Sequence, residues 1–149
     1  MSDENTDTLS QATYLKKALC AAQAAIDKKA LGPVLIDLHE AQSYTDYLLV
    51  VSAPGPRAVR AIAEHVEEVM SEQGHRALGI EGVGEGRWAL LDYGELVLHV
   101  FDQPLREFYD LEGMWFDAPR VELAVPPEQR LPHPDAYDYG DGSGLGLID

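Results

Sequence analysis

Hydrophobic positions in this chain recur at helical spacing in some segments and at strand spacing in others, which predicts a mixed α/β fold. The first helix should span about Ser10–Ala30 and end at Gly32-Pro33. Its apolar stripe consists of Leu15, Leu19, Ala22 and Ile26. Residues 1–8 are polar and acidic, and should form a flexible leader.

Two strands should follow this helix. Val34–Leu38 is short and apolar, and Asp46–Ser52 is almost entirely apolar. A strand of that kind is covered on both faces, so Asp46–Ser52 should lie in the centre of the sheet. A second helix should run from Pro56 to about Gln73, with Gly74 closing it. Its core face consists of Val59, Ile62, Ala63, Val66 and Met70.

The remaining predicted elements are an edge strand at Leu78–Glu81, a glycine-rich loop at Gly82–Gly86, a hairpin within Glu85–Phe101 and a short amphipathic helix at about Pro104–Gly113. The predicted order is therefore α-β-β-α-β-β-β-α. We expect a single-domain α/β sandwich with a mixed, roughly five-stranded sheet and flanking helices.

The hairpin, EGRWALLDYGELVLHVF, has two different faces. With Tyr93-Gly94 as a two-residue turn, Asp92 should pair with Glu95 and Trp88 with His99. One face is wholly apolar and must pack in the core; it carries Ala89, Leu91, Leu96, Leu98 and Val100. The other face mixes aromatic, aliphatic and charged side chains, namely Trp88, Leu90, Asp92, Glu95, Val97, His99 and Phe101.

Three interpretations of this mixed face stay open at this point. In the first, another helix of the same chain covers the face and His99 is hydrogen-bonded. In the second, the face is a protein–protein interface, because aromatic anchors with a polar margin are typical of such surfaces. In the third, a histidine and an aspartate of the face form a catalytic pair.

The net charge of the chain limits the kind of molecule that it can bind. The 149 residues include 26 acidic and 11 basic residues, which gives a formal net charge of −15. Proteins that bind nucleic acid directly neutralise phosphate with clustered lysine and arginine, which are scarce here. The sequence therefore argues against direct sequence-specific nucleic-acid binding and against anionic membranes, and favours a basic partner.

The sequence contains no strong motif for a metal site, a phosphate-binding loop or a catalytic site. The five histidines show no metal-ligand spacing, and Asp37, His39 and Glu40 make only a weak set of metal ligands after a strand. Gly82–Gly86 resembles a phosphate loop but lacks the following Lys-Ser/Thr. We predict no catalytic residue, no metal and no cofactor.

The single cysteine, Cys20, excludes an internal disulfide and should be a small buried side chain of the first helix. No apolar run reaches the length of a membrane span, and the N-terminus lacks the features of a secretory signal. These features predict a cytoplasmic protein. Residues 122–149 are acidic and rich in Pro and Gly, and should form a flexible tail.

Several segments together resemble the ribosomal silencing factor family, also called RsfS or Iojap-like. They are SYTDYLLVVS (Ser43–Ser52), AIAEHVEE (Ala61–Glu68), GIEGVGEGRWALLDYGELVLHVF (Gly79–Phe101) and REFYDLEGMWFDAP (Arg106–Pro119). The resemblance spans residues 9–121 and implies a nucleotidyltransferase-like fold without catalysis. The tail after about Pro126 departs from the family pattern.

The resemblance also implies a function. Family members bind the large ribosomal subunit through its protein numbered fourteen, obstruct joining of the small subunit, and so silence translation when nutrients are short. Organellar relatives are linked to large-subunit assembly, so an assembly factor is one alternative. A nucleotidyltransferase-like enzyme that uses Asp37, Glu40 and Asp46 is another. The family often forms homodimers, and the sequence leaves the oligomeric state open.

The contact residues that the resemblance implies lie mostly on the mixed hairpin face. On the hairpin they are Trp88, Leu90, Asp92, Tyr93, Val97 and His99. Tyr109, Leu111 and Trp115 match the family's final helix, where the resemblance implies either contact residues or packing residues.

Overall fold

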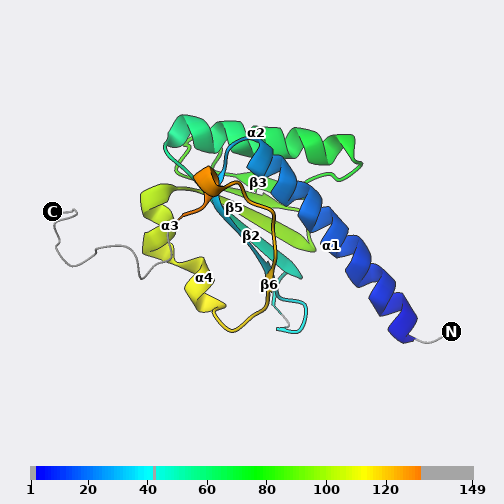
Figure 1. Ribbon diagram of the computed structural model, residues 1–149. Coiled ribbons are helices and arrows are strands. Elements are labelled where there is room, and N and C mark those ends of the chain that lie inside the picture. The colour runs from blue at the N-terminus through cyan, green and yellow to red at the C-terminus, as the bar shows by residue number, and fades with distance from the viewer. Residues whose placement is uncertain (1–2, 42, 132–149) are drawn as a thin grey trace.

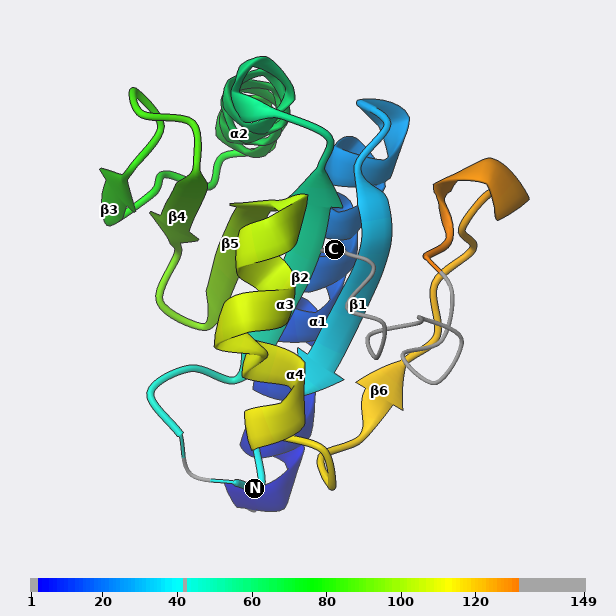
Figure 2. The ribbon, with the colours of Figure 1, turned by 90° about the vertical axis from the view of Figure 1, so that its left-hand side faces the viewer.

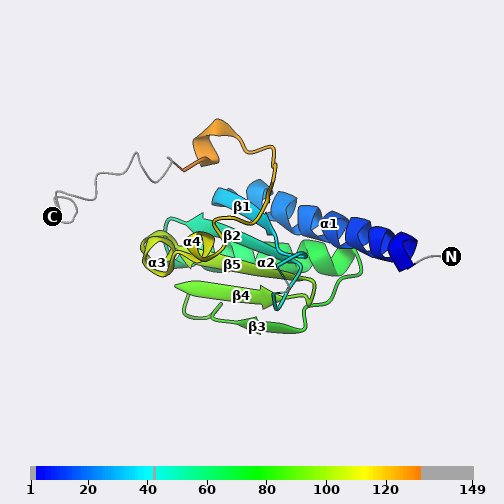
Figure 3. The same ribbon diagram turned by 90° about the horizontal axis from the view of Figure 1, so that it is seen from below.

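The computed structural model describes residues 3–41 and 43–131. Its first eight elements follow the predicted order, and helices lie on both faces of a mixed sheet (Figure 1). The sheet has six strands in the order β3-β4-β5-β2-β1-β6, where about five were expected. Figure 3 shows β3, β4, β5, β2 and β1 in this order. The central pair, β2 (Tyr47–Ala53) and β5 (Leu96–Asp102), is parallel, and the other neighbouring pairs are antiparallel.

Helix α1 (Asp3–Asp27) starts and ends earlier than predicted. Residues 3–8, expected to be a flexible leader, are helical, and residues 1–2 lie outside the described part. The helix stops before Ala30 because Lys29 adopts a left-handed conformation, with φ of 70°. Its N-terminal half projects beyond the sheet (Figure 1).

The buried stripe of α1 consists mainly of alanines. Those in the core are Ala18, Ala21, Ala22, Ala24 and Ala25. Ile26 is buried as predicted, whereas Leu19 is 38% exposed. Cys20 is half-buried against this core rather than fully buried, and burial raises the pKa of its thiol.

Strand β1 (Leu31–Asp37) begins earlier than predicted, because Gly32-Pro33 is part of the strand and does not end the helix. The pairing with β2 is irregular there, which is where a strand tolerates proline. Every residue of β2 is buried, as its continuous apolar sequence predicted. Strand β3 (Gly79–Glu81) lies at the edge of the sheet, also as predicted.

Helix α2 (Pro56–Glu72) agrees closely with the prediction. Its buried residues are the five expected ones, Val59, Ile62, Ala63, Val66 and Met70. Gly74 follows it with φ of 87°, a conformation that glycine adopts readily. Together α1 and α2 cover one face of the sheet and enclose the main core.

The hairpin of β4 (Trp88–Asp92) and β5 forms, but its turn is displaced from the predicted position. The Tyr93 N–H donates to Leu96 O at 2.8 Å, so Gly94 and Glu95 make the turn, not Tyr93 and Gly94. The physical reason is that Gly94, with φ of 86°, suits the first central position of such a turn.

The displaced turn shifts the strand register by two residues. Trp88 therefore pairs with Phe101, not with His99, and Asp92 pairs with Val97. Because the shift is even, the side chains of β4 and β5 stay on their predicted faces. Glu95 now lies in the turn, and its carboxylate pairs with Lys17 of α1 at 2.9 Å, away from the mixed face on which it was predicted. The apolar face lies in the main core as predicted, with Ala89, Leu91, Leu96, Leu98 and Val100 all fully buried.

Two short helices lie over the opposite face of the sheet (Figure 2). They are α3 (Gln103–Tyr109) and α4 (Leu111–Met114), and they replace the single predicted helix because Asp110 takes a left-handed φ of 46° between them. They enclose a smaller second core around Ile36, Leu38, Leu48, Val50, Val97 and Phe101. Helix α3 packs mainly on β5 and β2, and leaves β4 at its side.

The segment after α4 returns to the sheet. Strand β6 (Arg120–Val121) pairs with β1 and supplies the sixth strand. In the 3₁₀ turn η1 (Pro127–Gln129), the buried Gln129 side chain donates from Nε2 to Ile26 O and Ala30 O, each at 2.9 Å. Residues 122–131, expected in a flexible tail, thus lie against the body, and 132–149 fall outside the described residues.

Candidate protein-binding surface

The structure separates the nine predicted contact residues into two groups. Six have exposed or partly exposed side chains, and we call them the candidate surface: Trp88, Leu90, Asp92, Tyr109, Leu111 and Trp115. Three belong to β4, Tyr109 ends α3, Leu111 begins α4 and Trp115 directly follows α4. Figure 2 shows α3 and α4 in front of the sheet, with β4 beside them. The other three, Tyr93, Val97 and His99, are at most 5% exposed.

Tyr93 is the clearest departure from the predicted site. Its side chain lies in the main core, on the face opposite to the candidate surface, and is 2% exposed. Burial raises the pKa of its hydroxyl to about 12, and Lys17 Nζ lies 5.8 Å from the ring centroid. Tyr93 is therefore a core residue, not a surface contact. Val97 and His99 support the candidate surface from beneath.

The centre of the candidate surface is an aromatic cluster around Trp88. Its ring lies 4.6 Å from that of Tyr109 and 4.9 Å from that of Phe101, measured between centroids. The Trp88 Nε1–H donates to His99 Nδ1 at 2.9 Å. Since β5 and α3 both hold the indole, its partly exposed edge is presented in one fixed orientation.

His99 stays neutral inside this cluster. Because Nδ1 accepts from Trp88, the ring proton sits on Nε2, which is buried without a hydrogen-bond partner in the described structure. Burial lowers the His99 pKa to about 4. The Asp92 carboxylate instead accepts from the Gly94 N–H at 2.8 Å. The structure thus does not form a catalytic pair between His99 and Asp92.

These contacts bear on the three interpretations of the mixed face. Helix α3 covers part of it and His99 is hydrogen-bonded, as the first interpretation requires. The cover is incomplete, however, because Trp88, Leu90 and Asp92 stay partly exposed on β4. An aromatic surface with a charged margin remains, which is the composition that the second interpretation needs.

A buried arginine fixes α3 and α4 on the sheet. Arg106 Nη2 lies 2.6 Å from Glu112 Oε2 on α4, and Nη1 donates to Ser52 Oγ at 3.0 Å on β2. Nη1 also donates to Leu31 O at 3.4 Å. One side chain thus connects both short helices to two strands, and keeps the candidate surface rigid.

Sequence reasoning missed three exposed apolar residues that adjoin the candidate surface. Phe108, Met114 and Phe116 are 77%, 65% and 78% exposed. The Phe108 ring lies 5.0 Å from that of Tyr109. The signal was present in REFYDLEGMWF, which has more large apolar residues than one face of a short helix can bury.

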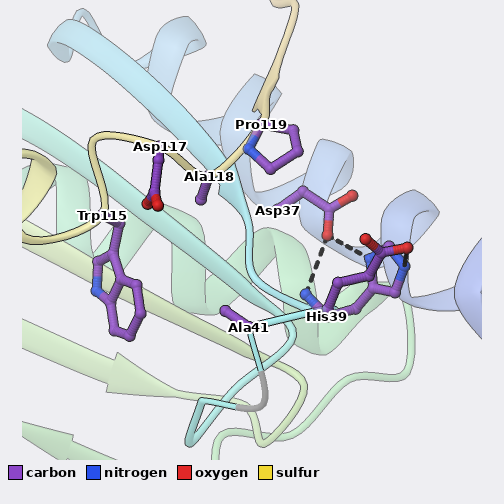
Figure 4. Close-up of a pocket in the computed structure, with 8 residues that line it drawn as sticks. Asp37, His39, Ala41, Trp115, Asp117, Ala118 and Pro119 are labelled. Carbon is purple, nitrogen blue, oxygen red and sulfur yellow. Dashed lines mark hydrogen bonds and ion pairs between the residues drawn. The ribbon is translucent and has the colours of Figure 1, made fainter.

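A hollow lies beside the candidate surface, between the β1–β2 loop and the segment after α4 (Figure 4). Asp37, His39, Glu40, Trp115 and Asp117 are among its lining residues. His39 Nδ1 lies 2.5 Å from Asp37 Oδ1, and this hydrogen bond raises the His39 pKa. Among the described residues, no group of three or more His, Cys, Asp or Glu side chains is arranged to hold a metal ion.

Taken together, the fold and the surface define a small α/β domain that presents a partly exposed aromatic surface beside α3 and α4. A model of the family described as "Ribosomal silencing factor during starvation" matches residues 11–139. The chain belongs to this family of ribosomal silencing factors. The match continues beyond residue 121, where we had predicted the domain to end.

Individual relatives agree with this family. Ribosomal silencing factor RsfS of Halalkalibacterium halodurans is 38% identical over 103 residues, which cover 69% of this chain and 88% of that protein. A protein of Chromobacterium violaceum whose crystal structure is known is 28% identical, with a TM-score of 0.67. The match covers 75% of this chain and 92% of the chain in that crystal structure. The chloroplastic protein Iojap of Arabidopsis thaliana is 26% identical over 121 residues, 81% of this chain and 48% of that protein.

No helix in the described part of the chain is long and apolar enough to span a membrane.

Proposed function

We propose that this protein binds the large ribosomal subunit through its protein numbered fourteen, and sterically blocks joining of the small subunit under nutrient limitation. It would do so in the cytoplasm, without catalysis. The observation that carries the proposal is the candidate surface, in a chain that belongs to the ribosomal silencing factors.

The structure of the surface supports a binding role. A few aromatic anchors that are held rigidly carry most of the affinity in many interfaces. Trp88 and Tyr109 fit that description, because they pack on each other and on a buried support. Exposed Phe108 and Phe116 extend the apolar area on the same side of the domain.

The net charge of the chain supports a basic protein as its partner. A protein embedded in ribosomal RNA is usually basic, and this chain carries a net charge of −15. Opposite charge speeds the encounter of two proteins and disfavours contact with bare RNA. A standard interface of about 1,600 Å² would let a domain of this size occupy a docking surface by binding alone.

Co-sedimentation with isolated large subunits tests the proposal. Wild-type protein should pellet with the subunits, and Tyr109→Ser should pellet less because it removes an exposed anchor. Leu78→Ser is the matched control, since it removes an exposed apolar side chain near the β3 edge, away from α3 and α4. If wild-type protein stays in the supernatant, the proposal is wrong.

Two alternatives make different predictions. A large-subunit assembly factor would still bind, but its depletion would leave precursor particles and subunit joining would be unaffected. A nucleotidyltransferase-like enzyme would consume nucleotides with magnesium, and alanine at Asp37, Glu40 and Asp46 would abolish that activity. The Asp37 carboxylate accepts hydrogen bonds from the His39 N–H and ring through Oδ1.

We also propose that the free protein forms a homodimer through the candidate surface. The same side chains cannot serve two partners at once, so dimerisation would compete with ribosome binding. Sedimentation equilibrium should show a mass that rises with concentration, and Tyr109→Ser should reduce that rise. A wild-type mass that does not depend on concentration would count against the dimer.

A further inference from the structure

The hollow beside α4 has a strongly negative lining. Asp37, Glu40 and Asp117 each contribute a carboxylate, and Asp117 forms no ion pair or side-chain hydrogen bond within the described part of the chain (Figure 4). Within the described residues, the ion pairs of Asp37 and Glu40 are both with His39, and the Asp46 carboxylate also acts on His39. Three carboxylates in the lining face a single histidine, so the lining is net negative at neutral pH.

Arg120, which directly follows the lining residue Pro119, forms no ion pair with the carboxylates of this lining. Arg120 donates from Nη1 to Trp115 O at 2.9 Å and to Ala118 O at 3.0 Å. Its Nη2 donates to Glu112 O at 3.2 Å. These carbonyl contacts hold the guanidinium on the backbone of the segment after α4, so the arginine shapes one wall of the hollow and does not pair with its carboxylates.

One wall of the hollow is aromatic. Trp115 is half-buried, packs on the second core, and lines the hollow (Figure 4). An indole face beside carboxylates is a favourable surrounding for a guanidinium or ammonium group, because the ring and the carboxylates both attract cations. Trp115 also belongs to the candidate surface, so the hollow and that surface are continuous.

We infer that the hollow receives an arginine or lysine side chain of the same protein partner that the candidate surface binds. The inference rests on the proposed function, and adds to it a subsite with a defined chemistry. RNA phosphate would be repelled by the three carboxylates. A basic side chain is matched by both the charge and the aromatic wall.

Removal of charge from the hollow tests the inference. Glu40→Gln/Asp117→Asn should weaken binding to large subunits about tenfold at low salt, as expected for the loss of two exposed charge contacts. The difference should nearly vanish at high salt, because charges are then screened within a few ångströms. Glu64→Gln/Glu68→Gln removes the same charge from the exposed face of α2, and should bind like wild type.

A second readout needs no ribosome. The chain has two tryptophans, so its NMR spectrum should contain two indole N–H signals. On titration with a hexa-arginine peptide, the Trp115 signal should shift. The Trp88 signal should stay, because Trp88 is not among the residues that line the hollow. The Trp115 shift should shrink in Glu40→Gln/Asp117→Asn and persist in the α2 control.

The two readouts separate failure of the inference from failure of the proposed function. If wild-type protein binds subunits and the hollow variant binds equally well at low salt, the inference is wrong and the proposed function stands. If the Trp115 signal shifts but subunits are not bound, the hollow accepts basic groups and the proposed function is wrong. A Trp115 signal unmoved by the peptide would overturn the subsite itself.

Discussion

At the scale of single residues, His99 shows what alternation along a strand can and cannot predict. The pattern placed Trp88 and His99 on one hairpin face, which the structure confirms. The predicted register placed the two residues directly opposite each other; because the turn lies one residue later, Trp88 pairs with Phe101 and reaches His99 diagonally. Alternation left the cover of His99 open among three interpretations, because it does not place α3, which comes later in the chain.

The buried state of His99 predicts a pH-dependent stability. Its folded-state pKa, lowered to about 4, lies below the unfolded value near 6.5, so the unfolded chain binds the proton first on acidification. The contribution of neutral His99 to the free energy of unfolding should be complete above about pH 6.5. It should be lost progressively towards pH 4, by up to about 3 kcal/mol. Urea unfolding across this range should give a flatter curve for His99→Phe than for wild type.

His39 should contribute a pH dependence of stability with the opposite sign. Its hydrogen bond to Asp37 raises its folded-state pKa, so the protonated form stabilises the fold at acid pH, and this contribution is lost as the pH rises through the folded pKa. In His39→Gln, the free energy of unfolding should therefore still fall at acid pH as it does in wild type. An identical pH curve for wild type and His99→Phe would show that His99 is not buried as described.

A second prediction at this scale concerns the apolar hairpin face. Leu98 is completely buried in the main core, so Leu98→Ala should lower the free energy of unfolding by about 2–5 kcal/mol. Leu78→Ala should change it by less than about 0.5 kcal/mol, since that side chain is largely exposed. Equal losses measured by urea unfolding would contradict the assignment of the faces.

At the scale of elements, the best predictions came where start and stop signals are local. Pro56 begins α2 and Gly74 follows its end, and its apolar residues recur at helical spacing. The end of α1, the break between α3 and α4, and the addition of β6 were not predicted. The first two depend on left-handed conformations of Lys29 and Asp110, which residues other than glycine rarely adopt. The third depends on a contact distant in sequence, the pairing of Arg120 and Val121 with β1.

The segment after β6 makes a testable contribution to stability. Gln129 is buried and satisfies two carbonyls at the end of α1, Ile26 O and Ala30 O. Gln129→Ala should therefore destabilise the domain by about 1–3 kcal/mol, because it leaves buried acceptors without a donor. Glu128→Ala is the control, since Glu128 is exposed in the same turn. No difference between the two in thermal unfolding would mean that this segment does not stabilise the body.

At the scale of the whole molecule, the two faces of the sheet have separate roles. The α1–α2 face holds the larger core and the fold's stability. The α3–α4 face holds a smaller core and presents Trp88, Tyr109 and Trp115 at its margin. Composition predicted an acidic domain with a basic partner, and the structure adds that the acidic hollow and the aromatic surface lie side by side.

Subunit joining tests the central proposal most directly. Isolated large subunits would be incubated with the protein, small subunits added, and joining followed by light scattering. Wild type should prevent joining, Leu78→Ser should act like wild type, and Tyr109→Ser should allow joining while remaining folded. Normal joining with wild-type protein bound to the large subunit would contradict ribosomal silencing by steric blocking, and would favour the role in assembly.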